Sequence, residues 1–234
     1  MAYIYEHIRT RGFEPLHFEE HFARLDALAR KLLLSPIAIE REELKRRITE
    51  CLRREGYSAN TMNAVCVKYH SNKSVEISAE EMLYRNFDLR TLRPQGHILR
   101  LSGEIILDNT SAKEAMLDLN RSMIESNNNT VPIWVDELGE VLSIDGASAV
   151  AVFDNEIRFS RWANGVEADM AQQFTLSHNR RVSRGAIMVE DLETASEVFF
   201  IDYRGVTALK RHKNHHYADI IAEKCAKQVA LSEQ

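Results

Sequence analysis

Apolar residues recur at helical spacing in several separate stretches of the chain. In the clearest one, Phe22, Leu25 and Leu28 follow one another at intervals of three residues, so they share one face of a helix. The pattern predicts helices over residues 18–33, 39–54, 111–126 and 216–230, and a short helix over residues 191–195. Gly56 follows the second helix, and the asparagine run 127–129 follows the third, as is typical of helix ends.

Shorter runs that are rich in β-branched and aromatic residues predict strands. These runs are residues 3–9, 15–17, 64–69, 98–102, 131–135, 141–143, 147–153, 157–159 and 198–202. Turns at residues 136–139 and 154–155 separate the strands of a meander in the second half of the chain. The stretch 70–94 is polar and has no clear pattern, and a mostly polar segment begins near residues 170–174.

Because helices and antiparallel strands come in separate runs, the sequence predicts an α+β fold. We expect two lobes, a smaller α+β lobe over residues 1–101 and a larger α+β lobe over residues 102–234. A chain of 234 residues is long enough to bury a hydrophobic core in each lobe.

The composition narrows the classes of function. A net charge of -5 argues against a nucleic-acid-binding protein, which needs a basic face. The apolar runs are far shorter than the roughly 20 residues that cross a bilayer, so no membrane segment is expected. Charged residues near the start interrupt any secretory signal. Three scattered cysteines without a CxxC pair are typical of buried thiols in a reducing compartment, which predicts a cytoplasmic protein.

Three stretches of the chain together carry a family resemblance. The first is YEHIR at residues 5–9, followed by HFARL at residues 21–25. The second is DELGEV at residues 136–141, which runs on to the turn at 154–155. The third is Asp191-Leu192 and Ala195 with EVFF at residues 197–200, followed by TAL at residues 207–209. In this order and spacing, they resemble the class IV aminotransferases, or fold type IV pyridoxal-phosphate enzymes.

That family includes D-amino-acid aminotransferase, branched-chain aminotransferase and 4-amino-4-deoxychorismate lyase. The resemblance implies a two-lobed fold, a homodimer, pyridoxal phosphate as cofactor and a small amino-acid-like substrate. It implies either pyridoxal-phosphate chemistry on amino acids or aminodeoxychorismate, or a cofactor-free, non-catalytic homologue that acts as a binding or structural dimer. Both alternatives stay open at the level of the sequence.

Such an enzyme needs a lysine, an acid for the pyridine nitrogen and donors for the phosphate. Arg24 matches the family's phosphate-binding arginine in type and spacing, and a guanidinium offers the bidentate fork that a phosphate prefers. The alternative is a surface arginine beside Glu20 and Asp26.

The place of the lysine depends on the alignment of the helix that follows it. Without gaps, the family's lysine position falls on Thr110. A deletion of three residues, close to one helical turn, would bring Lys113 there and make it the catalytic residue. The alternative is a solvated helix lysine beside Glu114.

The acid and the phosphate-binding turn depart from the family pattern. Ser143 replaces the family's glutamate, and Asp145 either substitutes for it or forms a turn with Gly146. The family's Gly-Ile-Thr-Arg-like turn, whose N–H groups meet the phosphate, corresponds to GVEA at residues 165–168. Gly165 and Val166 are therefore the remaining cofactor-binding candidates in this turn, with a glutamate in place of the threonine.

Two other groups of residues are weaker candidates. His212, His215 and His216 have a spacing that could bind a metal on a helix, but the basic residues among them favour a surface patch, so no metal site is predicted. Trp134 and Trp162 are expected in the core or at an interface.

Overall fold

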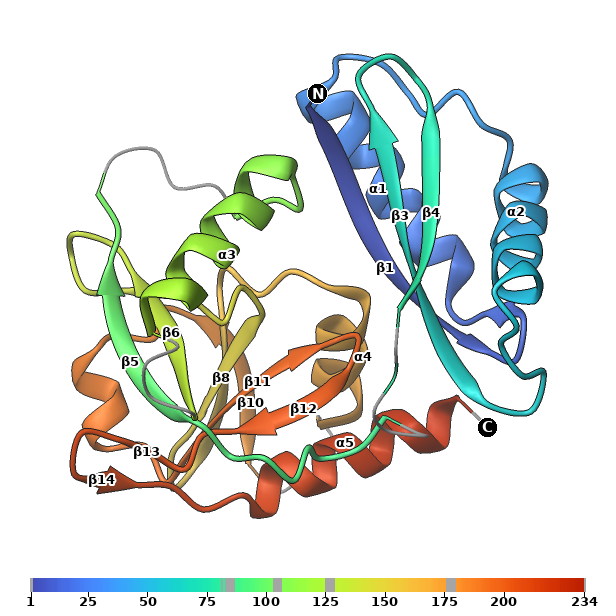
Figure 1. Ribbon diagram of the computed structural model, residues 1–234. Helices are drawn as coiled ribbons and strands as arrows, with labels where there is room; N and C mark the ends of the chain where they lie inside the picture. The colour runs from blue at the N-terminus through green and yellow to red at the C-terminus, as the bar shows by residue number, and fades with distance from the viewer. Residues whose placement is uncertain are drawn as a thin grey trace. The chain divides into compact units, whose positions relative to one another are not determined.

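The computed structural model describes residues 2–80, 82, 87–102, 107–124, 129–175 and 180–233 (Figure 1). The chain divides into two compact units. The first comprises Met1–Asn86 and Asp108–Glu114, and the second comprises Phe87–Leu107 and Ala115–Gln234. The sequence placed the boundary near residue 101 instead. The difference arises because strand β5 (Gln95–Arg100) pairs in parallel with strands of the second unit.

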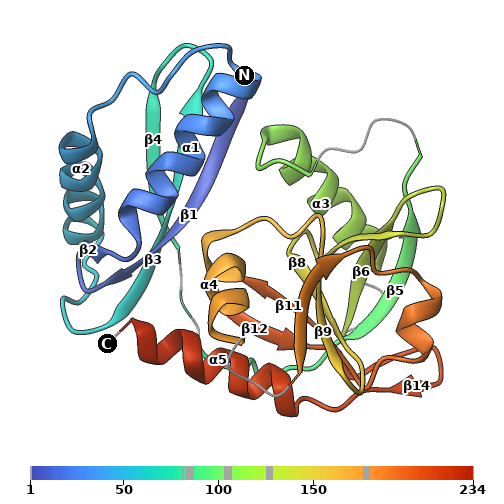
Figure 2. The ribbon, with the colours of Figure 1, turned by 180° about the vertical axis from the view of Figure 1, so that it is seen from behind.

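The first unit is an antiparallel sheet covered on one face by two helices (Figures 1 and 2). Its strands run in the order β2-β1-β3-β4. Their bounds, with those of the helices, are β1 (Tyr3–Arg11), β2 (Glu14–Pro15), α1 (Phe18–Leu32), α2 (Arg41–Arg54), β3 (Met62–His70) and β4 (Val75–Glu80). Strand β4 lies in the stretch for which the pattern predicted no element.

The core of the first unit is formed by every second residue of its strands, on the face that the helices cover. Ile4 and Ile8 of β1 pack with Leu25 of α1 and Leu52 of α2 in one buried cluster. Because successive side chains of a strand point to opposite faces, the residues with odd numbers in β1 lie on the face away from the helices. This second face carries His7 and other polar side chains.

The second unit consists of two five-stranded sheets and the helices that cover them (Figure 1). The first sheet has the order β10-β9-β8-β11-β12 and the second has the order β14-β13-β5-β6-β7. The further elements are α3 (Ser111–Ile124), β6 (Thr130–Val135), β7 (Val141–Ile144), β8 (Ser148–Val152), β9 (Glu156–Ser160), α4 (Val166–Thr175), β10 (Arg181–Gly185), the 3-10 helix η1 (Glu190–Glu193), β11 (Glu197–Asp202), β12 (Gly205–Ala208), β13 (Arg211–His212), β14 (His215–His216) and α5 (Ile220–Ser232).

Buried clusters define the layers of this unit. Apolar residues of α4 and α5, among them Ala171 and Ala222, pack on the face of the first sheet that Val150 and Phe199 line. The opposite face of that sheet packs against the second sheet. On the other side of the second sheet, Leu117 of α3 packs with residues of β6 and β7. The unit is therefore built as helix, sheet, sheet and helices.

The predicted α+β class is confirmed, and the first two helices and most strands lie where the pattern predicted them. Several segments differ. Helix α4 begins at Val166 and runs into the segment predicted to be mostly polar, which also contains β10. Strands β12, β13 and β14 were not predicted, and the last helix begins at Ile220 rather than at residue 216. The predicted end of the third helix, at residues 125–128, lies outside the described residues.

All three cysteines of the chain, Cys51, Cys66 and Cys225, are buried thiols. Within the described ranges, the helices are too short or too polar for any of them to cross a lipid bilayer.

Candidate functional site

A buried carboxylate in the first unit holds the arginine that the sequence singled out. Glu6 lies between Ile4 and Ile8 on the face of β1 that meets the helices, and only 3% of it is exposed. Its Oε1 accepts a hydrogen bond from Arg24 Nε at 3.2 Å and lies 2.8 Å from His21 Nδ1. Arg24 and His21 are one helical turn apart on α1, so the HFARL motif of residues 21–25 places both side chains on one carboxylate.

The positive charge of Arg24 and the hydrogen bond from His21 stabilise the negative charge of Glu6. Burial alone would raise the pKa of the Glu6 carboxyl, but the hydrogen bond from His21 and the charge of Arg24 outweigh burial and lower that pKa. Glu6 is therefore a carboxylate at neutral pH. With its Nε held by Glu6 and its side chain 20% exposed, Arg24 has a fixed guanidinium plane suited to an anion.

Lys113 belongs to the same hydrogen-bonded chain as Arg24. Glu6 Oε2 accepts a hydrogen bond of 3.4 Å from Asn109 Nδ2, and Asn109 Oδ1 accepts one of 3.0 Å from Lys113 Nζ. Lys113 is 7% exposed, so it is a buried lysine and not the solvated one that was the alternative. Arg24, Glu6, Asn109 and Lys113 thus form a continuous polar cluster, although the catalytic role of Lys113 stays a prediction.

Thr110 stands where an ungapped alignment places the lysine, and it has a structural role. Its Oγ1 accepts a hydrogen bond of 3.2 Å from the backbone N–H of Lys113, as an N-cap residue does for a helix. Its backbone also forms a bridge with Ile4 of β1. Thr110 therefore begins α3 and ties its first turn to the sheet, and Lys113 lies in that first turn.

The sequence analysis included Glu6 and His21 in its motifs but gave them no part in the site, and it did not name Asn109. For Glu6, a signal existed in the sequence. Because Ile4 and Ile8 mark the core-facing side of the first strand, a charged residue between them must be buried and paired. Asn109 offered no such signal, since it lies in the irregular segment before α3.

In the second unit, Ser143 stands where the sequence led us to expect an acid, and its neighbour across the sheet is Trp134. Ser143 of β7 is 5% exposed and lies directly opposite Trp134 of β6, which is fully buried against Leu117 and Leu142. Among the residues that the structure describes, neither Ser143 Oγ nor Trp134 Nε1 has a hydrogen-bond partner. A neutral hydroxyl beside a buried indole cannot hold a pyridinium nitrogen as a carboxylate would.

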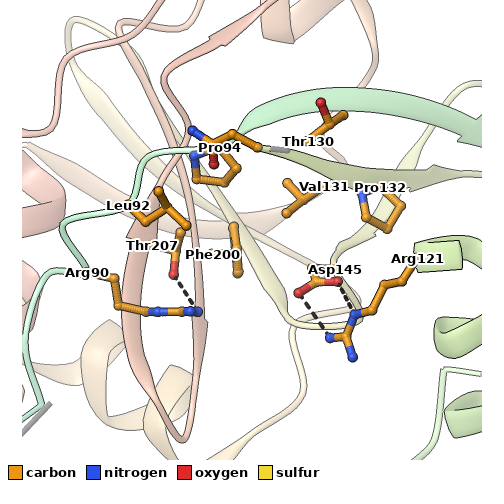
Figure 3. A pocket seen from close by; sticks show the side chains of 11 residues that line it. Arg90, Leu92, Pro94, Arg121, Thr130, Val131, Pro132, Asp145, Phe200 and Thr207 are labelled. Carbon is orange, nitrogen blue, oxygen red and sulfur yellow. Dashed lines mark hydrogen bonds and ion pairs between the residues drawn. The ribbon is translucent and has the colours of Figure 1, made fainter. Parts of the chain in front are cut away.

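Asp145 occupies the tight turn between β7 and β8. Asp145 and Gly146 both have positive φ, 51° and 75°, as the two central residues of a type I′ turn require. The Asp145 carboxylate accepts hydrogen bonds from Nε and Nη2 of Arg121 at 3.0 and 3.1 Å, so its two oxygens engage one guanidinium (Figure 3). Nη2 of Arg204 lies 3.7 Å from Oδ2 of the same carboxylate. This geometry favours the turn over the cofactor as the place of Asp145.

A cavity of about 320 Å³ lies beside this ion pair in the second unit (Figure 3). Arg121 and Asp145 form part of its wall, and Arg90 donates a hydrogen bond of 3.2 Å to Thr207 Oγ1 in another part. Its volume is at the lower end of the range for small-molecule sites, which is about 300–1,000 Å³.

The predicted phosphate-binding turn opens helix α4. The helix begins at Val166, and the backbone oxygen of Gly165 accepts a hydrogen bond of 3.0 Å from the N–H of Asp169. Glu167 follows in the first turn and is 7% exposed. Its Oε2 lies 3.9 Å from the point where a side chain on Gly165 would begin. A carboxylate therefore lies at the helix end where the sequence predicted a phosphate, and two anions would repel there.

The remaining candidates have structural surroundings. His212 is buried in strand β13, with its Nδ1 3.1 Å from the backbone oxygen of Gly96, so it is not part of a surface patch. Trp162 is 41% exposed, and its Nε1 donates a hydrogen bond of 2.9 Å to Glu140. His215 Nε2 lies 2.8 Å from the backbone oxygen of Ala195. The three histidines do not share one face of a helix, because His212, His215 and His216 lie in a hairpin of two short strands.

Comparison with known proteins defines the class of fold. No family model matches the chain, and no curated protein sequence does. Solved structures do match. A hypothetical aminotransferase from Mycobacterium tuberculosis has a TM-score of 0.81 at 14% identity, covering 99% of this chain and 90% of that chain. The T.th. branched-chain amino acid aminotransferase, complexed with N-(5′-phosphopyridoxyl)-L-glutamate, has a TM-score of 0.78 at 18% identity, covering 97% and 83%.

A third match extends the likeness to lyases. A candidate 4-amino-4-deoxychorismate lyase from Legionella pneumophila has a TM-score of 0.78 at 13% identity, covering 99% of this chain and 91% of that chain. The chain therefore has the fold of the fold type IV pyridoxal-phosphate enzymes. Within that class, the matched structures are aminotransferases and a lyase, as the motifs predicted.

The residues present fit the cofactor only in part. Arg24 offers a cation for a phosphate and Lys113 offers a buried amine, and both lie in the first unit. In the second unit, Ser143 provides no carboxylate for a pyridine nitrogen, and Glu167 places a carboxylate at the N-terminus of α4. At the matched positions, the second unit therefore does not supply the acid and the phosphate donors that pyridoxal phosphate needs.

Proposed function

We propose that this protein is a divergent member of the class IV aminotransferase fold that acts as a binding protein, without pyridoxal-phosphate catalysis. The observation that carries the proposal is the buried pair of Ser143 and Trp134, where Ser143 is the residue that the sequence matches to the family's acid. An electron sink needs a protonated pyridine nitrogen, and a neutral hydroxyl leaves that nitrogen without a stabilising charge. The fold persists while the chemistry has lost a required part.

The ligand that this proposal favours is a small anion with a phosphate or carboxylate group. Arg24 supports it, because Glu6 holds the guanidinium by one nitrogen and fixes the plane of the others. We further propose that the protein acts as a homodimer in the cytoplasm. The family resemblance supports the dimer, and three buried thiols support a reducing compartment. The net charge of -5 gives no support to nucleic acid as a partner.

A second candidate function is catalysis with Lys113 as the reacting lysine. The burial of Lys113, and its link to Arg24 through Asn109 and Glu6, favour this candidate. Its Nζ is buried and donates a hydrogen bond to Asn109, so the amine has a fixed position in the polar cluster. The protein would then be an aminotransferase or lyase acting on amino acids or aminodeoxychorismate.

An absorption spectrum separates the two candidates. The purified protein is mixed with pyridoxal phosphate, desalted and scanned for the visible band of a lysine Schiff base. Our proposal predicts no band after desalting. A band that survives desalting, is lost in Lys113→Ala and is kept in Lys224→Ala, a change of an exposed lysine, would establish the catalytic candidate instead.

Calorimetric titration tests the role of Arg24 as an anion site. Pyridoxal phosphate and inorganic phosphate serve as probes, and the matched control is Arg41→Ala, which removes an exposed arginine paired with Glu19. If Arg24 binds the anion, Arg24→Ala weakens binding about tenfold to a hundredfold, the value of a charge-assisted bidentate contact. Equal binding by wild type and Arg24→Ala would remove Arg24 from the proposed site.

A further inference from the structure

Three side chains with metal-binding atoms meet on the first unit's sheet, on the face away from α1 and α2. They are His7 of β1, Cys66 of β3 and Glu80 of β4. An imidazole nitrogen, the thiol sulfur and a carboxylate oxygen all lie within 4.8 Å of one another. Neither the family resemblance nor the proposed function uses this cluster.

The register of the sheet places the three residues together. His7 is paired directly with Cys66 across the antiparallel strands β1 and β3, so their side chains are on the same face. On the next strand, Ser78 is opposite Cys66 and Glu80 is two residues further along, which places Glu80 diagonally to Cys66 on that face. Each residue therefore comes from a different strand of a rigid, hydrogen-bonded sheet.

The distances are close to those of a zinc site. A tetrahedral zinc ion has bonds of about 2.0–2.3 Å, so its ligand atoms are about 3.3–3.8 Å apart. His7 Nε2 and Glu80 Oε1 are 3.8 Å apart. The donor atoms lie within 4.8 Å of one another, and because both of these side chains are partly exposed, at 25% and 32%, a change of rotamer can bring them closer without moving the sheet.

The donor types and charges suit a divalent ion of intermediate softness. Imidazole, thiolate and carboxylate are the ligands that zinc uses, and three protein ligands with an open fourth position are typical of its reactive sites. A neutral imidazole, a thiolate and a carboxylate carry two negative charges together, which one divalent ion neutralises.

Cys66 would bind the ion as a thiolate, so the thiol proton has to leave. Metal binding would form the sulfur–metal bond as the S–H bond breaks, and the proton would leave to solvent. One proton is then released for each ion bound.

Two positively charged side chains, Lys68 and Arg9, lie on the same face of the sheet as the three proposed ligands. Lys68 is two residues beyond Cys66, but its Nζ lies 3.3 Å from the carboxylate of Glu114 and 3.4 Å from the hydroxyl of Tyr3. Arg9 is two residues beyond His7 on β1. Their positive charges weaken the binding of a further cation but favour a negatively charged thiolate.

We propose that His7, Cys66 and Glu80 bind a divalent transition-metal ion, with zinc as the ion that best matches the donor set. The site lies on one sheet of the first unit and does not depend on whether the chain binds pyridoxal phosphate.

Cobalt and zinc titrations of the full chain test the site. With cobalt, we expect one equivalent to give a thiolate-to-cobalt charge-transfer band, which histidine and carboxylate ligands alone do not give. The band should disappear in Cys66→Ser and persist in Cys225→Ser, which changes a buried thiol in α5. By competition with a chromogenic chelator, His7→Ala and Glu80→Gln should each weaken zinc binding by more than about tenfold.

Two results with cobalt would contradict the proposed metal site. Absence of the band in folded wild-type protein, or its persistence in Cys66→Ser, would overturn the proposal. If Cys66→Ser fails to fold by circular dichroism, His7→Ala and Glu80→Gln decide alone, because both positions are partly exposed. Unchanged zinc affinity in both of those variants would then refute the site.

Discussion

Replacing Glu6 by glutamine tests the buried ionic cluster that holds Arg24. The change keeps the shape of the side chain and an oxygen that accepts hydrogen bonds, but it removes the negative charge. In the wild type, this charge accepts from Arg24 Nε at 3.2 Å and lies 2.8 Å from His21 Nδ1, with almost no exposure to water. Glu6→Gln therefore leaves a cation beside a buried neutral amide.

The expected cost follows from the strength of hydrogen bonds to charged groups. Such a bond contributes about 1.5–3 kcal/mol when buried, so we expect Glu6→Gln to lower the free energy of unfolding by about that amount. In a chain of this size, 1 kcal/mol moves the melting temperature by about 2–4 °C, which gives a decrease of about 3–12 °C. The control is Glu19→Gln, whose carboxylate is paired with Arg41 on the surface and should change stability by no more than about 0.5 kcal/mol.

The pH dependence gives the prediction a second test. The pKa of Glu6 in the folded protein is lower than its ordinary value of 4.5, so ionisation of Glu6 stabilises the fold at every pH above that value. The stabilisation is lost as the pH falls from about 4.5 through the lowered pKa. Thermal melts of wild type and Glu6→Gln should differ most at neutral pH and converge in acid. Equal stability of the two at pH 7, within about 0.5 kcal/mol, would refute the cluster as described.

Three further predictions concern the backbone, the core and the assembly. Both Gly12 and Gly56 have positive φ, but a Cβ on Gly12 would lie 2.2 Å from a backbone oxygen, so Gly12→Ala should destabilise far more than Gly56→Ala in thermal melts. Leu52→Ala should cost about 2–5 kcal/mol in denaturant unfolding, whereas Leu34→Ala, at an exposed position, should cost less than about 0.5 kcal/mol. Light scattering at micromolar concentration should give about twice the 26.9 kDa of the chain, and a monomer mass would contradict the proposed dimer.

The sequence predicted the fold where local patterns and tertiary structure agree. The amphipathic helix beginning at Phe18 and the strand beginning at Tyr3 follow directly from the period of their apolar residues. The motifs around Arg24 and Asp136 predicted the class of fold, and solved structures of that class match the chain at only 13–18% identity.

Other parts could not be predicted, because they depend on residues distant in sequence. Strand β4 and the hairpin of β13 and β14 are short or polar, and they are strands because of their partners rather than their composition. Asn109 joins Lys113 to Glu6 only after the irregular segment before α3 has folded onto β1. Likewise, Trp134 and Ser143 lie opposite each other only because of the register in which β6 and β7 pair, which the sequence does not show.

The central claim, that the fold is kept while the lysine chemistry is lost, is tested most directly by trapping. The protein is incubated with pyridoxal phosphate, desalted, reduced with borohydride and digested for mass spectrometry, since reduction fixes any Schiff base to its lysine. We predict an unmodified peptide around Lys113 in wild-type protein, because the residues of the second unit do not support the cofactor. A pyridoxyl group found on Lys113 in near-stoichiometric amount, and absent from exposed lysines such as Lys224, would contradict the claim.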